Sequence, residues 1–171
     1  MQTLSKHLDS APFLRNREPE FLASILKKLN SNPHILEIGT FRGLSAVLMA
    51  QVRKDAAIIT IDSHVGVPQC NLFSSYDLVI SNLKKYGVKN VQHLQLSSQN
   101  FHTELLFDLI FIDGSHLFEN VSFDYNKFKN NLKKGGFMIF HDYGTHRGVT
   151  KLCDSLGTPT ILFKSMAVYQ L

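Results

Sequence analysis

The sequence lacks the features that mark secreted, disulfide-stabilised and membrane-spanning proteins. Among its 171 residues are only two cysteines, Cys70 and Cys153, which lie far apart and in no spacing typical of a metal site. No apolar run approaches the ~20 residues of a membrane span, and the N-terminus has no signal-peptide core. We therefore expect a cytoplasmic protein with no membrane segment.

A strong excess of charge of one sign is also missing. The chain has 18 basic and 14 acidic residues, a net charge of +4, and 44% hydrophobic residues. Paired lysines at residues 27–28, 84–85 and 133–134 each lie near the end of a helical pattern, where cations stabilise the helix dipole. No basic stripe with interleaved aromatic residues is present, so we expect no nucleic-acid partner. Length and composition fit one globular domain.

Helical and strand-like patterns alternate along the chain. Apolar runs typical of parallel strands covered on both faces occupy residues 35–38, 57–61, 91–96, 109–112 and 137–140. Helical patterns occupy residues 18–29, 44–53, 76–86, 119–132 and 149–156. This alternation predicts an α/β domain with a parallel sheet.

Two further strand-like runs, residues 160–163 and 166–169, are separated by only Lys164 and Ser165. The gap is too short for a helical crossover, so we predict an antiparallel hairpin. The whole pattern predicts a Rossmann-like, doubly wound domain over residues 18–171. Its seven-stranded sheet is mostly parallel, with the antiparallel hairpin at the C-terminus. Residues 1–17 form an N-terminal segment that we interpret as a candidate lid.

The most informative motif follows the first predicted strand. Glu37, Gly39 and Gly43 form an E-x-G-x-x-x-G pattern at a turn between a strand and a helix. The G-x-G-x-x-G spacing, which presses backbone against a pyrophosphate, is missing. A carboxylate here would repel a pyrophosphate, but it suits a ligand that carries an ammonium group. The turn therefore predicts a binding crevice at the carboxyl edge of the sheet.

Acidic residues also follow three later strands. Asp62 lies 19 residues after Gly43, where an acid accepts hydrogen bonds from ribose hydroxyls in dinucleotide-binding folds; an Asx-turn is the alternative. Asp113 follows the fourth strand and begins a D-G-S-H segment, and Asp142 follows the fifth strand and His141.

Adjacent strand ends would bring Asp113 and Asp142 together beside an imidazole. Asp113, Asp142 and His141 therefore predict a divalent-cation site, most like one for Mg²⁺. Such an ion would lower the pKa of a bound hydroxyl. Histidine is softer than the ligands that Mg²⁺ prefers, so a metal-free reaction with His116 or His141 as general base is the alternative. His146 and Arg147, in the loop after the fifth strand, are open to a substrate contact or a surface role.

These motifs resemble those of the class I S-adenosylmethionine-dependent methyltransferases, in the small catechol and sugar O-methyltransferase-like branch. The resemblance implies S-adenosylmethionine as cofactor and a small-molecule hydroxyl as methyl acceptor. It places Glu37 near the methionine ammonium group and Asp62 at the ribose, and it makes Asp113, His116 and His141 the catalytic candidates. The implied cofactor-binding residues all follow strand ends: Glu37, Gly39, Thr40, Phe41, Gly43, Asp62, Ser63, Ser98, Gln99 and Asp113.

One position departs from the family pattern. Where the family usually has an acid that contacts adenine, this chain has Ser97, Ser98 and Gln99. Ser98 or Gln99 would have to supply that hydrogen bond, or the segment is a plain polar loop.

We expect no appended domain that would close the site. Residues 1–17, the loop at 63–75 or a second subunit must do so, and we expect a homodimer. Two other functions stay open. One is a non-catalytic cofactor-binding or interaction module of the same fold. The other is a nicotinamide-dependent oxidoreductase, against which the missing G-x-G-x-x-G spacing counts.

Overall fold

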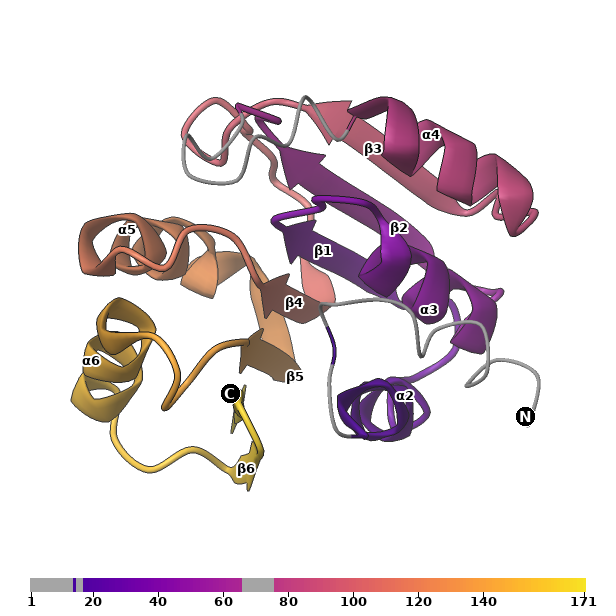
Figure 1. The fold of residues 1–171 in the computed structure, drawn as a ribbon. Helices are drawn as coiled ribbons and strands as arrows, with labels where there is room; N and C mark the ends of the chain where they lie inside the picture. The colour runs from indigo at the N-terminus through magenta and orange to yellow at the C-terminus, as the bar shows by residue number, and fades with distance from the viewer. Residues whose placement is uncertain (1–13, 15–16, 66–75) are drawn as a thin grey trace.

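Seven strands form one sheet in the order β3-β2-β1-β4-β5-β7-β6 in a computed structural model that describes residues 14, 17–65 and 76–171 (Figure 1). The strands are β1 (His34–Ile38), β2 (Ala57–Asp62), β3 (Val91–Gln95), β4 (Phe107–Ile112), β5 (Leu132–Phe140), β6 (Ile161–Phe163) and β7 (Met166–Gln170). β1 to β5 pair in parallel, and β7 runs antiparallel to both β5 and β6. The predicted sheet and its C-terminal hairpin are confirmed.

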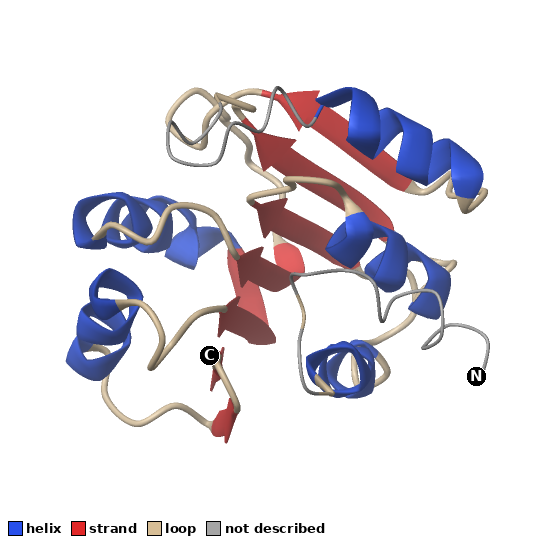
Figure 2. Cartoon of the chain, in the orientation of Figure 1, coloured by secondary structure: helices blue, strands red, loops and turns tan. Residues whose placement is uncertain are grey.

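Helices cover both faces of this sheet (Figures 1 and 2). On one face lie α2 (Glu18–Leu26) and α3 (Leu44–Val52), and α4 (Tyr76–Lys85) lies beside α3 and β3. On the other face lie α5 (Phe118–Phe128) and α6 (Arg147–Ser155). The predicted N-terminal lid, except for Leu14 and Arg17, and most of the loop at 63–75 lie outside the described residues.

Side chains along the central strands point alternately to the two faces of the sheet and pack into two separate cores. Ile35 in β1 packs in the core under α2 and α3, whereas Leu36 and Ile38 pack in the core under α5 and α6. Because successive strand side chains point to opposite faces, Glu37 shares the face of Ile35. A carboxylate is thereby placed at the sheet surface beneath α3.

The boundary between α5 and β5 differs from the prediction. The helix ends at Phe128, a 3₁₀ turn occupies Lys129–Asn131, and β5 begins at Leu132 rather than at residue 137. The sequence suggested a break between the helix and the strand at Gly135, which has φ 80°. Instead, the strand continues through it, because Gly135 N–H donates to Leu171 O and Leu171 N–H donates to Gly136 O.

Two smaller predictions also need correction. The first helix ends at Leu26 rather than at residue 29. β3 is an edge strand with Gln92 and Gln95 exposed, so it is not a run covered on both faces. An edge strand is more open to solvent than a central strand, so polar residues are tolerated within it.

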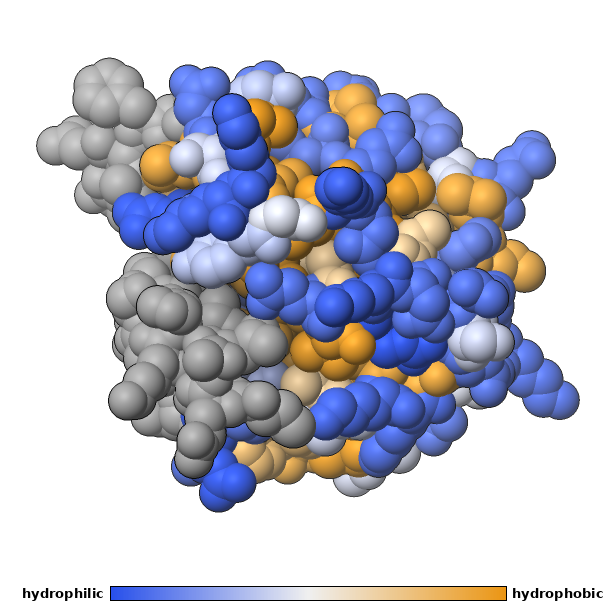
Figure 3. Space-filling view, turned by 90° about the vertical axis from the view of Figure 1, so that its right-hand side faces the viewer, coloured by the Kyte–Doolittle hydropathy of each residue, from blue (hydrophilic) through white to orange (hydrophobic). Residues whose placement is uncertain are grey.

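Among the described residues, no helix is long and apolar enough to cross a membrane. The face seen in Figure 3 is mostly hydrophilic, with apolar side chains exposed in small, separate patches. Single exposed apolar residues of this kind are ordinary on a globular protein.

Gly39, just after β1, lies in close backbone contact with Asp113, just after β4. It has φ 95°, and a Cβ built there would lie 2.2 Å from the Asp113 carbonyl oxygen. We expect Gly39→Ala to lower the free energy of unfolding by about 3 kcal/mol or more, since steric overlap adds to backbone strain. Gly87, with φ 64° and open space around it, is the matched control. Its alanine variant should lose only about 1–2 kcal/mol from strain. Equal losses in urea unfolding of the two variants would contradict this account.

Candidate active site

The predicted site residues gather at the carboxyl ends of β1, β2, β4 and β5. β1 lies between β2 and β4, so the chain changes direction across the sheet at this point, where α/β sheets open their binding crevice. Backbone hydrogen bonds extend the ladder past the strand ends: Gly39 N–H donates to Ile61 O, Asp113 N–H to Ile38 O, and His141 N–H to Ile112 O. These bonds hold Gly39, Asp113 and His141 in neighbouring rows.

The turn after β1 is built from three residues in the left-handed region. Gly39, Phe41 and Gly43 have φ values of 95°, 47° and 74°, and Gly43 N–H donates to Thr40 O at 2.7 Å. A Cβ on Gly43 would lie 3.0 Å from a methyl group of Val79 on α4. The close approach predicted for Gly39 is thus made to the protein's own backbone at Asp113. Both glycines are accounted for by internal packing.

Asp62 organises that turn. Its Oδ2 accepts hydrogen bonds from the backbone N–H groups of Thr40 (3.0 Å) and Phe41 (2.8 Å), and its Oδ1 accepts from His64 N–H (2.8 Å). The bond to His64 is the Asx-turn that the sequence left as the alternative. A carboxylate can accept about four hydrogen bonds, so these three leave capacity for a ligand hydroxyl. Ser63 lies beside it, half-buried.

Glu37 is fully buried at the end of β1. Thr60 Oγ1 donates to Glu37 Oε2 at 2.5 Å, and Thr40 Oγ1 lies 2.6 Å from Thr60 Oγ1. The second oxygen, Oε1, is buried and has no hydrogen-bond partner among the described residues. Burial raises the pKa of Glu37 to about 8, although Ser45 and Thr60 limit the rise. An isolated buried carboxylate of this kind is costly unless a cation or donor completes it.

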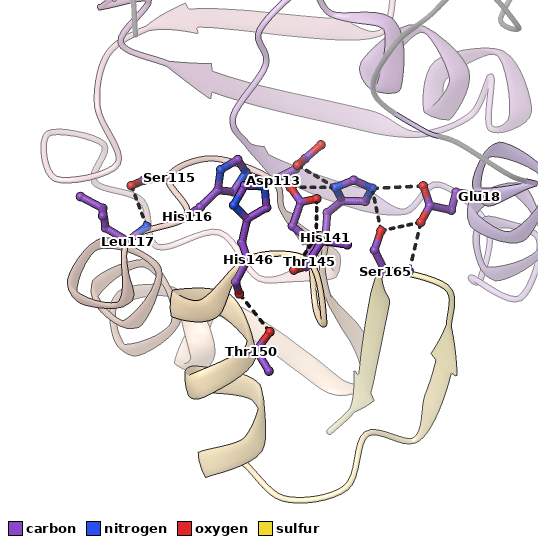
Figure 4. A network of polar contacts seen from close by, with 11 residues as sticks. Glu18, Asp113, Ser115, His116, Leu117, His141, Thr145, His146, Thr150 and Ser165 are labelled. Carbon is purple, nitrogen blue, oxygen red and sulfur yellow. Dashed lines mark hydrogen bonds and ion pairs between the residues drawn. The ribbon is translucent and has the colours of Figure 1, made fainter. Parts of the chain in front are cut away.

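The carboxylates predicted to share a divalent cation lie beside His141. Asp113 Oδ1 and Asp142 Oδ2 are each 3.2 Å from His141 Nδ1, and donor atoms of all three residues fit within 4.8 Å (Figure 4). Asp142 has φ 67°, and Thr145 Oγ1 donates to its Oδ1 at 3.0 Å. The predicted convergence of Asp113 and Asp142 is confirmed.

His141 has carboxylates on both sides of its ring. Its Nε2 lies 3.2 Å from Glu18 Oε2, and Glu18 Oε1 accepts a hydrogen bond from Ser165 Oγ at 2.5 Å. Burial alone would lower the pKa of His141, but Asp113 and Asp142 outweigh it and raise the pKa to about 11. Burial raises the pKa of Asp113, whereas bonds from His116 and His141 hold the pKa of Asp142 well below its usual range despite burial. The neighbouring carboxylates therefore favour the protonated form of His141.

His116 lies at the exposed side of the same cluster. Its Nε2 is 2.8 Å from Asp142 Oδ2, and its ring stacks on His146 with centroids 3.9 Å apart and planes 19° apart. The hydrogen bond to Asp142 raises the pKa of His116. The side chain is 42% exposed, so solvent and small molecules reach it. His146, open at first to either role, lies in this cluster.

Ser98 and Gln99 lie in the loop after β3. Asp124 on α5 is buried and shares a hydrogen bond with Ser98, and burial raises the pKa of Asp124 to about 6. Lys127 Nζ donates to the carbonyl oxygens of Ser98 and Gln99, both at 2.8 Å. An acid does stand beside this loop, but α5 contributes it. Gln99 is exposed.

Sequence reasoning missed four residues of this site: Glu18, Thr60, Asp124 and Ser165. In the sequence, Glu18 is an acid in the first turn of a helix, where the helix dipole alone explains a negative charge. Thr60 offered a usable signal, because a hydroxyl within an otherwise apolar parallel strand needs a partner.

Comparison with known proteins identifies the class. Residues 36–143 match the family model of a methyltransferase domain. The O-methyltransferase NovP superimposes with a TM-score of 0.76 and 17% identity, over 90% of this chain and 79% of that one. A protein described as a caffeoyl-CoA O-methyltransferase from Staphylococcus aureus gives 0.74 and 16%, over 98% and 89%. At these identities the likeness to the solved structures shows the fold.

A sequence relative is the uncharacterized protein R132 of Acanthamoeba polyphaga mimivirus, 35% identical over 128 residues. The match covers 66% of this chain, and the chain spans about half the length of that relative (52%). Since the family model covers more than half of the chain, the chain belongs to the methyltransferase-domain family. Residues 36–143 form its methyltransferase domain, and its fold is that of the O-methyltransferase structures. The nicotinamide-dependent alternative is not supported.

Because the pKa of Glu37 is raised, we predict that the free energy of unfolding decreases as the pH rises. Between the ordinary pKa of 4.5 and about 8, the folded protein holds a proton that the unfolded chain has released, so the cost grows across this window and is complete above it. Glu37→Gln removes that cost. In the cofactor-free protein at pH 8.5 it should raise the free energy of unfolding by on the order of 3–5 kcal/mol, and by almost nothing at pH 4.5.

Urea unfolding at several pH values measures this difference. Glu20→Gln, an exposed position on α2, is the control and should leave the pH profile unchanged. A Glu37→Gln variant that is equally or less stable at pH 8.5 would show that the carboxylate is satisfied by the protein itself.

Proposed function

We propose that this chain transfers the methyl group of S-adenosylmethionine to a hydroxyl group of a small molecule. The observation that carries the proposal is the Asp142–His116 pair, an imidazole oriented by a carboxylate at the exposed side of the crevice. A hydroxyl acceptor loses its proton when it is methylated, and an oriented imidazole can take that proton. The O-methyltransferases among the similar structures support the same choice.

The proposed cofactor position follows from two carboxylates. Glu37 Oε1 is the buried acceptor without a partner, and the ammonium group of the methionine moiety would complete it. Asp62, at the end of the neighbouring strand β2, retains acceptor capacity for the ribose hydroxyls. The backbone of Thr40 and Phe41, in the turn after β1, connects the positions of Glu37 and Asp62. Among similar structures, that of a coclaurine N-methyltransferase contains S-adenosylhomocysteine.

The proposed chemistry is a direct displacement. The acceptor oxygen attacks the sulfonium methyl carbon, the carbon–sulfur bond breaks, and S-adenosylhomocysteine leaves. With His116 Nε2–H donating to Asp142, the other ring nitrogen, Nδ1, is the acceptor for the hydroxyl proton. Asp142 stabilises the imidazolium that forms, as a carboxylate does for the histidine of a catalytic triad.

His141 suits the role of general base poorly. It is 7% exposed, and both of its ring nitrogens face carboxylates. When no metal is bound, its pKa of about 11 favours the protonated ring over a free base. We therefore assign proton transfer to His116 and a binding or structural role to His141.

Asp113, His141 and Asp142 fit a divalent cation. Their donor atoms lie within 4.8 Å of one another, and His141 Nδ1 is a buried nitrogen without a hydrogen-bond partner among the described residues. A bound cation would act as a Lewis acid that lowers the pKa of the acceptor hydroxyl. With or without a bound cation, the residues of the site would orient the acceptor and His116 would hold its proton.

Two further proposals concern how the crevice is closed and whether the fold is catalytic. A homodimer would let a second subunit close the crevice. A non-catalytic role for the same fold would show cofactor binding without methyl transfer.

Variation of His116 tests the chemistry. With S-adenosylmethionine and a panel of small hydroxylated acceptors, His116→Gln should lower kcat by roughly 10²–10⁴-fold, because the proton acceptor is lost. Affinity for S-adenosylhomocysteine, measured by calorimetry, should stay the same. His102→Gln, at an exposed position in another loop, is the control. Full activity of His116→Gln would remove the residue from the mechanism, and an unchanged rate in excess chelator would remove the metal.

A further inference from the structure

The N-terminal helix contributes a buried carboxylate to the cluster around His141. Glu18 lies 123 residues away along the chain, yet it is 3% exposed and its Oε2 is 3.2 Å from His141 Nε2. Its Oε1 accepts hydrogen bonds from Ser165 Oγ (2.5 Å) and Ser165 N–H (3.2 Å). Figure 4 shows Glu18 on one side of the imidazole and Asp113 on the other. A buried carboxylate held this firmly fixes the ring that it faces.

The other ring nitrogen is aimed at the space between two carboxylates. His141 Nδ1 is buried without a hydrogen-bond partner among the described residues, 3.2 Å from both Asp113 Oδ1 and Asp142 Oδ2. Histidine ligands of metals almost always donate their second ring N–H to a carboxylate or carbonyl, which sets the ring's orientation and its tautomer. Glu18 occupies that second position here.

We propose that Glu18, supported by Ser165, fixes His141 as a nitrogen ligand and thereby makes the site selective for a first-row transition metal. The inference rests on the proposed function, because it concerns the same Asp113–His141–Asp142 site. One imidazole and two carboxylates suit Mn²⁺, Co²⁺ or Zn²⁺, whereas Mg²⁺ prefers oxygen ligands alone. Glu18 is then a positioning residue that touches neither substrate nor cofactor.

This proposal separates two clusters that share Asp142. His116, Asp142 and His146 also have donor atoms within 4.8 Å of one another. The rings of His116 and His146 are stacked nearly parallel, so their in-plane lone pairs do not converge on one point. Among the described residues, Asp142 is the only carboxylate that orients these two rings. The His141 cluster is therefore the better preorganised of the two.

The test is a titration of the purified chain with Co²⁺, followed by the visible absorption of the ion and by calorimetry, with Mg²⁺ titrated in parallel. We expect one Co²⁺ per chain, bound at least tenfold more tightly than Mg²⁺. Glu18→Gln and Glu18→Ala should weaken Co²⁺ binding by about 10–100-fold, because the ligand loses its orienting carboxylate. Glu20→Gln, exposed on the same helix, should bind Co²⁺ like the unaltered protein.

Two further measurements locate the ion and guard against misfolding. The Co²⁺ bands should disappear in His141→Ala and persist in His146→Ala; the reverse result would overturn the proposal. S-adenosylhomocysteine affinity should be unchanged in both Glu18 variants. If Glu18→Ala does not fold, the isosteric Glu18→Gln decides.

Mg²⁺ bound as tightly as Co²⁺, or Co²⁺ affinity unchanged in the Glu18 variants, would contradict the proposal. So would a chain that binds S-adenosylhomocysteine but no Co²⁺, and in that case the proposed methyl transfer would stand. A chain that binds Co²⁺ as expected but no S-adenosylhomocysteine would count against the proposed function instead.

Discussion

The arrangement of His141 among three carboxylates is the interaction on which the candidate site depends. Glu18 begins α2, Asp113 follows β4, and Asp142 follows β5, and all three meet at one imidazole. Ser165, between β6 and β7, is tied to the same cluster through Glu18. The site is therefore complete only when the N-terminal helix and the C-terminal hairpin have both docked on the sheet. Removing His141 would leave three carboxylates close together without the imidazole that they share.

The surroundings of the carboxylates in this crevice shift their pKa values in opposite directions. Burial raises the pKa of Glu37 to about 8, and its Oε1 has no hydrogen-bond partner among the described residues, so a positively charged ligand group would complete it. Asp142 faces two imidazoles, which hold its pKa well below the usual range. One carboxylate is thus suited to receive a ligand cation and the other to orient a base. Divergent pKa values of chemically identical groups are a general mark of such a division of roles.

The fold was predictable because its signals are local. Apolar runs, helical periodicity and the two-residue gap at Lys164 and Ser165 each depend on a few neighbouring residues. The end of α5 was misplaced because Gly135 and Gly136 look like a break, and only contacts with Leu171 show that they continue a strand. Those contacts join residues that are distant in the sequence.

The site was predictable only where function and strand ends coincide. Glu37, Asp62, Asp113 and Asp142 were found because ligands bind at the carboxyl edge of such sheets. Glu18 could not be found, since nothing in its local sequence separates a helix-dipole acid from one that reaches His141. The turn-forming bonds of Asp62 were anticipated only as an alternative to ligand binding, whereas the geometry makes both roles compatible. Side-chain networks between distant segments are the part that sequence patterns do not carry.

The most direct test of the central claim is an experimental structure with S-adenosylhomocysteine bound. The account predicts the ligand amino group within hydrogen-bond distance of Glu37 Oε1, its ribose hydroxyls against Asp62, and its sulfur open toward His116 and Asp142. A ligand bound elsewhere on the chain, or one whose amino group leaves Glu37 Oε1 without a partner, would contradict it.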